Sequence, residues 1–157
     1  MANAAAEATP DRVVQLVTFR LGGETYGVDV MNVQEVLRIT EIAPVPGAPD
    51  YVLGIINLRG NVVTVVDTRA RFGLPSSETD DASRIVIVES ENQVVGILVD
   101  SVAEVVELNQ SEIDVPPNVG NEDSGRYVLG VANRESDLLI VIDLDKLLAR
   151  DDWSGAA

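Results

Sequence analysis

The chain has 157 residues and contains neither cysteine nor histidine, which excludes disulfides, thiolate nucleophiles, zinc thiolate sites and histidine general bases. Its formal net charge is −15 at pH 7, so it lacks the basic surface needed to bind nucleic acid or an anionic membrane surface. Hydrophobic residues make up 46% of the chain but aromatic residues only 4%, which predicts a core built mainly from Val, Ile and Leu.

The sequence shows no sign of membrane insertion or export. It has no apolar run long enough to span a bilayer, and its first eight residues lack the basic start and apolar core of a signal peptide. We therefore expect a cytoplasmic protein without direct membrane insertion. We interpret the acidity as a solubility feature, with a saline habitat as the alternative.

The N-terminal half predicts short strands separated by turns. Residues 1–12 are small or polar without periodicity, which predicts a disordered tail. Residues 13–21 alternate apolar and polar side chains, as a half-buried strand does, and the glycines at 22–23 predict a hairpin turn. Valine spacing predicts a short helix over 30–35, and a helical turn is expected over 68–72. The strands expected in this half are 13–21, 24–29, 54–58 and 62–66.

The C-terminal half repeats this organisation. Residues 73–83 are rich in turn-forming side chains and are interpreted as a linker. Prolines, glycines and acids predict a long exposed loop over 109–125. A short terminal helix is expected over 144–150, with Asp143 as its N-cap, before a tail over 151–157. The strands expected in this half are 84–89, 93–99, 102–108, 126–133 and 137–143.

Two segments occur twice, in the same order. Residues 51–58 read Y-V-L-G-I-I-N-L, and residues 127–134, which lie 76 positions later, read Y-V-L-G-V-A-N-R. The pattern G-x-x-V-x-x-V-x-E-V begins at Gly27 and again at Gly96. Ordered, ungapped repeats of this length are typical of a duplicated small domain. The copies differ at one turn, where Arg59 has no counterpart.

The duplication and the many short Val-rich strands predict the fold class and the lobes. We expect a mainly β protein with two similar, small, closed β-barrels packed side by side. The first lobe is expected over about 13–76 and the second over about 82–150. Lobes of this size are marginal alone, so we expect them to share an interface and to fold as one unit.

No pattern indicates catalysis or a metal or cofactor site. The carboxylate pairs Asp80/Asp81 and Asp151/Asp152 lie in polar segments, where nothing would separate their pKa values. Residues 122–125 are only a fragment of a Ca²⁺-binding loop, and no glycine-rich phosphate loop precedes a helix. Serines have no histidine partner. We therefore expect a protein that is not an enzyme and that needs no cofactor.

Several motifs resemble the CheW family of bacterial chemotaxis coupling proteins. They are Y-G-V-D-V-M-N-V-Q-E-V from Tyr26, G-I-I-N-L-R-G from Gly54, V-V-T-V-V-D-T-R from Val62 and V-V-G-I-L-V-D from Val94. The resemblance covers about residues 14–150. It implies two tandem SH3-like five-stranded barrel lobes with short helices. It also implies a non-catalytic adaptor that links transmembrane chemoreceptors to a histidine kinase in membrane-associated arrays.

The resemblance also implies two sets of site residues. The N-L-R-G turn and the V-Q-E-V segment belong to the partner surfaces of the family, and a groove between the lobes receives the receptor tip. The expected kinase-binding residues are Glu35, Asn57, Leu58, Arg59 and Gly60. The expected receptor-binding residues are Val30, Val33, Val99, Val102 and Val105. An arginine on a tight turn presents a planar set of donors suited to a carboxylate or to backbone carbonyls.

Alternatives remain open at this stage. Arg59 could be an exposed turn residue without a role, Glu35 and its mate Glu104 could both be solvated structural positions, and Val33 and Val102 could be core residues. The chain could also act in another signalling system, as a kinase regulatory domain or as part of a fusion protein. A small-molecule-binding barrel is the alternative from a different class.

Overall fold

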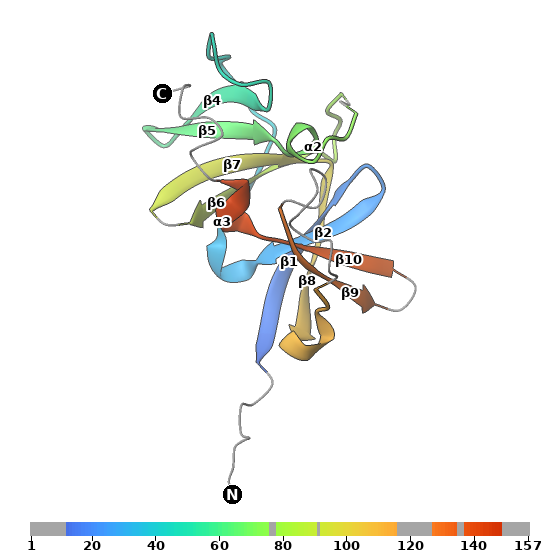
Figure 1. Ribbon diagram of the computed structural model, residues 1–157. Helices are drawn as coiled ribbons and strands as arrows, with labels where there is room; N and C mark the ends of the chain where they lie inside the picture. Colours follow the sequence, from blue (N-terminus) through green and yellow to red (C-terminus); the bar gives the residue numbers. More distant parts are fainter. Residues whose placement is uncertain (1–11, 76–77, 91, 116–126, 135–136, 149–157) are drawn as a thin grey trace, which may run out of the picture.

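The computed structural model describes residues 12–75, 78–90, 92–115, 127–134 and 137–148, and these residues form two five-stranded sheets (Figure 1). The first sheet has the order β8-β1-β2-β10-β9, and the second has the order β3-β6-β7-β5-β4. The strands of the first sheet are β1 (Val13–Leu21), β2 (Glu24–Asp29), β8 (Ser101–Asn109), β9 (Val128–Arg134) and β10 (Asp137–Ile142). Those of the second are β3 (Val33–Arg38), β4 (Val52–Leu58), β5 (Asn61–Asp67), β6 (Arg84–Ser90) and β7 (Gln93–Val99).

A short helix follows each of four strands, β2, β5, β8 and β10. The 3-10 helices are η1 (Val30–Asn32) and η2 (Gln110–Glu112), and the one-turn α-helices are α2 (Thr68–Arg71) and α3 (Leu144–Leu147). Asp67 caps α2 by accepting from the Arg69 and Ala70 amides, and Asp143 caps α3 by accepting from the Lys146 amide. The two caps stand at equivalent positions of the repeat, which explains why aspartate occurs in both copies.

One predicted element is wrong. The valine spacing predicts a helix over 30–35, but only Val30–Asn32 is helical and the chain then continues as β3. The physical reason is tertiary: β3 pairs antiparallel with β6, with Val36 opposite Val86, and this pairing outweighs local helical spacing.

The sheets do not follow the two halves of the chain, 13–76 and 82–150, that the sequence predicts as lobes. The first sheet takes β1 and β2 from the first half and its other three strands from the second half. The second sheet takes β3, β4 and β5 from the first half and β6 and β7 from the second. The two copies thus exchange their first hairpins. The hairpin β1–β2 of the first copy joins the last three strands of the second, and the hairpin β6–β7 of the second copy joins the last three strands of the first.

Equivalent parallel pairs join the exchanged strands. In the second sheet β5 runs parallel to β7, with Val65 opposite Gly96. In the first sheet β10 runs parallel to β2, with Val141 opposite Gly27. Val65 and Val141 are repeat mates, as are Gly27 and Gly96, so the two sheets have the same register as well as the same order.

The repeated glycines Gly54 and Gly130 allow another segment of backbone to pass close to their strands. The backbone of Ala43 forms an isolated bridge with Ile55, and that of Asp114 forms the equivalent bridge with Val131. A Cβ on Gly54 would lie 2.1 Å from the Ala43 carbonyl oxygen, and one on Gly130 would lie 2.7 Å from the Asp114 carbonyl oxygen. Glycine is therefore required in both copies because the crossing backbone occupies the side-chain space.

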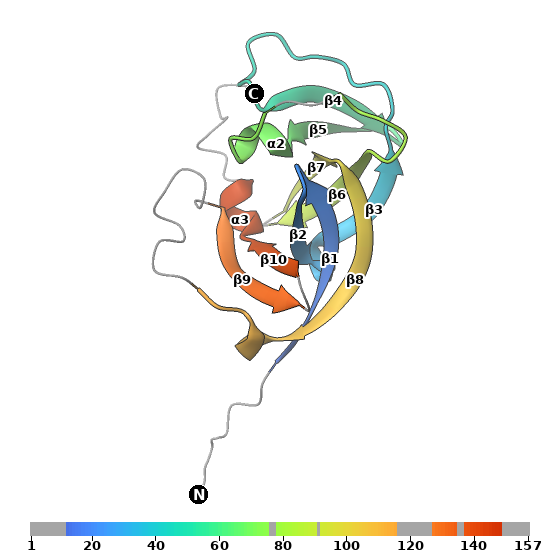
Figure 2. The same ribbon diagram turned by 90° about the vertical axis from the view of Figure 1, so that its right-hand side faces the viewer.

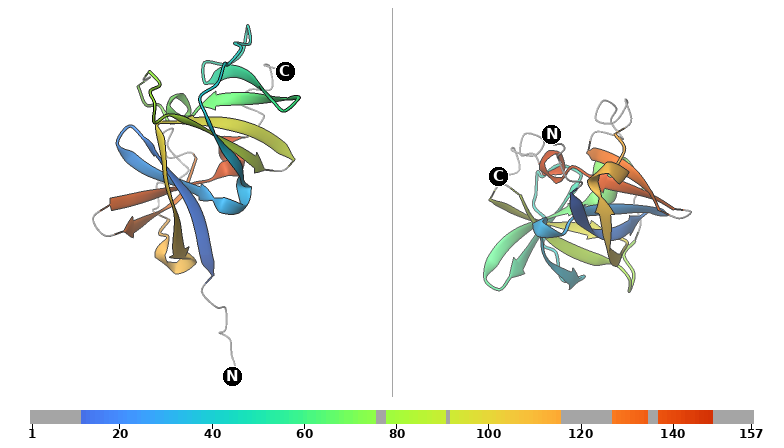
Figure 3. Two further views of the ribbon diagram at one scale, coloured as in Figure 1. Left: turned by 180° about the vertical axis from the view of Figure 1, so that it is seen from behind. Right: turned by 90° about the horizontal axis from the view of Figure 1, so that it is seen from below.

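The predicted closed barrels are present as strongly curved sheets whose hydrogen-bond ladders stay open. Among the described strands, β8 and β9 form the two ends of the first sheet, and β3 and β4 form those of the second. The curvature of each sheet, and the way the two lie against one another, are visible from behind and from below in Figure 3.

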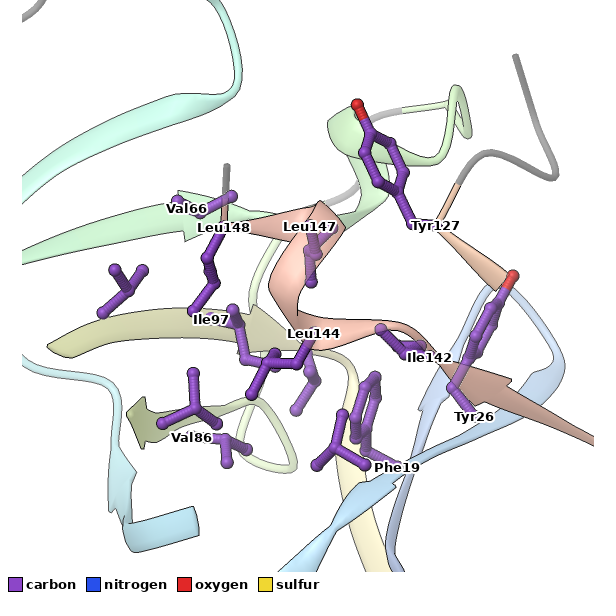
Figure 4. Packing of buried hydrophobic residues seen from close by; sticks show 14 of the residues in the cluster. Phe19, Tyr26, Val66, Val86, Ile97, Tyr127, Ile142, Leu144, Leu147 and Leu148 are labelled. Carbon is purple, nitrogen blue, oxygen red and sulfur yellow. The ribbon is translucent and has the colours of Figure 1, made fainter. Parts of the chain in front are cut away.

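The largest core cluster lies between the two sheets. Val86 and Val88 of β6 face it, while Ile85 and Ile87 face a smaller cluster enclosed by the second sheet itself. Both faces of β6 are thus buried, which explains its continuous apolar run. The helix α3 fills the centre of the main cluster: Figure 4 shows Leu144, Leu147 and Leu148 between residues of the two sheets.

The Thr18 side chain supplies hydrogen bonds at the point where the pairing of β1 with β8 shifts its register. The pairing shifts between Val17 and Phe19, and the hydroxyl of the buried Thr18 bonds the chain at this bulge. Thr18 Oγ1 donates to the Glu104 carbonyl oxygen at 2.6 Å and accepts from the Glu104 amide at 3.0 Å. The hydroxyl therefore takes the place of the missing backbone partners.

The change Thr18→Val should lower the free energy of unfolding by about 1–2 kcal/mol, because two backbone groups of Glu104 lose a partly buried hydrogen-bond partner. Thr18→Ser keeps the hydroxyl and is the matched control. Thermal melts of both variants test the role of the bulge. If the Val variant melts at the same temperature as the Ser variant, the hydroxyl does not support the bulge.

Candidate functional site

The N-L-R-G segment is a two-residue turn that connects β4 and β5. Leu58 pairs with Asn61, and the two residues between them have positive φ angles, 51° at Arg59 and 90° at Gly60. Two positive φ angles in succession are typical of a type I′ hairpin turn. The Gly60 amide donates to Asn57 Oδ1 at 2.8 Å, so the Asn57 side chain bonds the turn that follows it.

Arg59 is an unusual residue for its place in this turn. The left-handed conformation favours glycine, asparagine or aspartate, and another residue there costs about 1–2 kcal/mol. The other described non-glycine residue with positive φ is Asn92, which is a usual choice. Local preference therefore does not account for Arg59, and a backbone outlier of this kind points to a role for the side chain.

The Arg59 side chain forms a two-pronged ion pair with Glu35. Nη1 donates to Glu35 Oε1 at 3.2 Å, and Nη2 contacts Oε2. The bond from Arg59 lowers the pKa of the Glu35 carboxyl. The Arg59 side chain stays 68% exposed, against 28% for Glu35, so the guanidinium remains accessible to a partner.

This ion pair connects the two open ends of the second sheet. Glu35 lies on β3, and the turn that carries Arg59 follows β4, the opposite end of the same sheet. A side-chain contact thus bridges the gap that the backbone ladder leaves open. All five residues expected to bind the kinase, which are Glu35, Asn57, Leu58, Arg59 and Gly60, belong to this sheet or its turn.

Of the five valines expected to line a groove, four have exposed surface and one is buried. Val30, Val33 and Val102 are partly buried against the main core cluster, and Val105 is 56% exposed on the end strand β8. Val99 is only 1% exposed, so it is a core residue that presents no surface to a partner. The repeat pattern places Val30 and Val99 at equivalent positions, but Val30 stands in η1 whereas Val99 ends a central strand.

Sequence reasoning missed an ion pair between α2 and the link from β7 to β8. Arg69 donates from Nε to Asp100 Oδ1 at 2.9 Å and from Nη2 to Asp100 Oδ2 at 2.6 Å. Asp100 also accepts from the Gly22 amide in the β1–β2 turn at 2.9 Å. Asp100 thus ties the hairpin of the first sheet to α2 beside the second, and these bonds lower the pKa of its carboxyl. No local pattern could have paired residues 31 positions apart.

The change Asp100→Asn should lower the free energy of unfolding at pH 7 by about 1–2 kcal/mol, between the values for an exposed and a buried pair. Because the folded-state pKa of Asp100 is lowered, its contribution is present above the pKa of a free aspartate. The contribution is lost as pH falls through the folded-state pKa. The difference between wild type and variant should therefore shrink below about pH 4.

Urea unfolding of both proteins at neutral and at acidic pH measures this difference. The exposed Asp50 provides a matched control, Asp50→Asn, which should not alter stability at either pH. A gap between wild type and Asp100→Asn that does not change with pH would contradict the role of the carboxylate charge.

Of the acidic segments noted in the sequence, Asp80/Asp81 lies within the described residues. Asp80 accepts from the amide of Ala82 within its own exposed turn, while residues 122–125 and 151–152 lie outside the described residues. Within the described ranges, no group of three or more acidic side chains could hold a metal ion. Over the same part of the chain, no helix is long and apolar enough to cross a membrane.

Comparison with known proteins assigns the family. The family model for the CheW-like domain matches residues 15–152. A chemotaxis protein CheW of Treponema pallidum (strain Nichols) is 35% identical over 146 residues, covering 90% of this chain and 86% of that protein. A chemotaxis protein CheW of Rhizobium meliloti (strain 1021) is 32% identical over 142 residues, covering 90% and 92%.

A solved structure agrees with the fold. The crystal structure of the scaffolding protein TtCheW from Thermoanaerobacter tengcongensis matches with a TM-score of 0.81 and 36% identity, over 88% of this chain and 94% of that one. The chain therefore belongs to the CheW family, whose members are non-catalytic scaffolding proteins of chemotaxis signalling.

Proposed function

We propose that this chain is the adaptor that couples transmembrane chemoreceptors to a chemotaxis histidine kinase, as a cytoplasmic component of membrane-associated arrays. The observation that carries the proposal is the Arg59 turn. An exposed guanidinium stands on a strained two-residue turn, oriented by Glu35, in a chain whose relatives are chemotaxis proteins.

The kinase regulatory domain is the proposed partner of the second sheet. Glu35 occupies only part of the five-donor guanidinium, so Arg59 can still donate to a partner carboxylate or to backbone carbonyls. The ion pair also reduces the conformational freedom that Arg59 would lose on binding. Asn57, Leu58 and Gly60 support this contact by fixing the turn.

The receptor tip is the proposed partner of the apolar residues on η1, β3 and β8. Val30, Val33, Val102 and Val105 offer partly exposed apolar surface, whereas Val99 is buried and is not part of the proposed surface. Surface of this kind suits the apolar face of a helix, such as the tip of a helical coiled coil. These residues come from both sheets, so the surface depends on how the sheets are placed.

The alternative of a small-molecule-binding barrel has one feature in its favour. A concavity of about 460 Å³ lies beside β1 and β9. However, Val13, Met31 and Leu129 on its lining are each more than half exposed, and a ligand pocket normally buries most of its ligand. The geometry therefore favours the adaptor.

Co-sedimentation tests the proposal. Membranes that contain a chemoreceptor, or vesicles that display its cytoplasmic tip, are mixed with this protein and with the kinase, each alone and both together. The adaptor function requires that this protein pellets with the receptor and increases the amount of kinase that pellets. If the kinase pellets equally with and without this protein, the proposed coupling is wrong.

A further inference from the structure

The helix α2 carries an arginine that contacts both copies of the repeated tyrosine. The Arg71 guanidinium carbon lies 4.2 Å from the ring centroid of Tyr51 and 4.4 Å from that of Tyr127. Its Nη2 donates to the Leu147 carbonyl oxygen at 3.1 Å. Tyr51 directly precedes β4 of the second sheet, while Tyr127 directly precedes β9 of the first, and Leu147 follows β10. One side chain therefore connects the two sheets.

These contacts lie where the two copies of the repeat meet. Tyr51 and Tyr127 are repeat mates, and Leu147 stands at the position equivalent to Arg71, 76 residues later. The carbonyls of the two tyrosines accept from the amides of Asp67 and Asp143, each at 2.7 Å. Figure 2 shows α2 and α3 side by side at this junction. Arg71 thus breaks the symmetry of the duplication at the place where the sheets join.

The two proposed partner surfaces depend differently on this junction. The kinase surface lies within the second sheet and its turn. The receptor surface is divided, because Val33 lies on β3 of the second sheet whereas Val102 and Val105 lie on β8 of the first. A change in the relative placement of the sheets would deform the divided surface and leave the undivided one intact.

From this arrangement we propose that Arg71 is a positioning residue for receptor binding. It holds the two sheets in the orientation that brings η1, β3 and β8 into one surface, without touching the receptor itself. The guanidinium suits this task, because its central carbon lies over both rings while Nη2 donates to the Leu147 carbonyl oxygen. The inference rests on the proposed adaptor function and assigns to it the residue that couples the sheets.

Two variants of the full chain test the proposal. Arg71→Leu introduces the residue found at the equivalent position 147, and Arg71→Lys keeps the charge but not the planar donor group. Affinity is measured for a soluble fragment that contains a chemoreceptor tip and, separately, for the kinase regulatory domain. Leu139→Ala, which changes a buried residue of a cluster within the first sheet, is the control for a loss of stability within one sheet.

Arg71→Leu should weaken receptor binding about tenfold, the size of change expected for a residue that modulates coupling without touching the ligand. Kinase binding should stay within about twofold of wild type, because distant independent sites do not influence one another. The receptor affinity of Arg71→Lys should lie between that of wild type and that of Arg71→Leu. If both affinities fall together, or if receptor binding is unchanged, Arg71 is not a positioning residue.

A distance measurement tests the placement of the sheets independently of any partner. Because the chain has no cysteine, Arg38→Cys on β3 and Glu107→Cys on β8 give two unique sites for spin labels at exposed positions. The distance distribution between the labels should be narrow with Arg71 present and broader or shifted in Arg71→Leu. An unchanged distribution would overturn the inference.

The two measurements separate the failure of the inference from that of the proposed function. If the wild-type protein binds neither the receptor fragment nor the kinase domain, the adaptor proposal fails, and the spin-label result still decides whether Arg71 sets the placement of the sheets. If wild type binds both and Arg71→Leu binds both equally well, only the inference fails.

Discussion

Residues 1–76, expressed alone, are expected to aggregate or to remain without fixed tertiary structure, although they make up one complete copy of the repeat. The exchange of strands is the reason. This fragment contains β1 and β2 without the other three strands of the first sheet, and β3, β4 and β5 without β6 and β7. The parallel pairings β5–β7 and β2–β10 would both be lost, which leaves strand edges and Val-rich faces uncovered.

A fragment of similar length provides the control. Residues 30–100 contain all five strands of the second sheet and every buried residue of the cluster that this sheet encloses. This fragment loses the cover of the main cluster, so it should be only marginally stable, as domains of this size generally are. It should nevertheless show near-native β content by circular dichroism and a cooperative unfolding transition.

Comparing the two fragments tests whether the sheets or the copies of the repeat are the folding units. A sharp cooperative melt of 1–76, together with an unfolded 30–100, would show that the contiguous halves are the folding units and that the strand exchange does not determine stability. The opposite pattern would establish that the sheets, rather than the copies of the repeat, are the units that fold.

The duplication could be recognised from the sequence because the repeated residues have roles fixed by local geometry. Asp67 and Asp143 cap the helices that follow them, and Gly54 and Gly130 leave room for a crossing backbone. Such requirements act within a few residues or admit one residue type only, so both copies keep them. Strand positions were predictable for a similar reason, since apolar runs end at turns.

The composition of each sheet could not be predicted, because nothing local distinguishes a strand that pairs within its own copy from one that pairs with the other copy. The parallel pairs involve segments with the same Val-rich character as the antiparallel ones. The strand β3 was missed for the same reason, since its pairing with β6 is not encoded in its own residues. The roles of Arg69 and Arg71 depend on residues far away in the chain, and only the fold brings these partners together.

The difference between the copies singles out the Arg59 turn, and the geometry of this turn permits a sharp test of its proposed role. Arg59→Ala is expected to weaken binding of the kinase regulatory domain by roughly 30-fold, since a charged contact at an interface centre can contribute about 2 kcal/mol. Its effect on the free energy of unfolding should be small, because the Arg59 side chain is 68% exposed and its charge is screened by solvent. Titration calorimetry and thermal melts measure the two quantities on the same samples.

Arg59→Lys separates charge from shape. Lysine keeps the positive charge on the turn but has no planar group that can serve Glu35 and a partner together. If binding depends on the guanidinium, the Lys variant should bind nearly as weakly as the Ala variant. Recovery that disappears as salt is added would instead indicate a general electrostatic attraction, because exposed charges are screened by salt.

The ion pair itself suggests a structural alternative, in which Arg59 only ties the turn to β3 and the partner contacts other groups. The double variant Arg59→Glu with Glu35→Arg decides between the two roles. It keeps an ion pair across the open ends of the second sheet but places the positive charge on β3 and the negative charge on the turn. A turn that docks through its guanidinium should not regain kinase binding in this variant at any ionic strength. A pair that acts only as a bridge should regain it, since the bridge is present in either orientation.

We expect no recovery, because a bridge alone would not require an arginine in a left-handed conformation that favours glycine or asparagine. Wild-type affinity in the double variant would show that the turn is a structural element and would move the kinase surface to another part of the sheet.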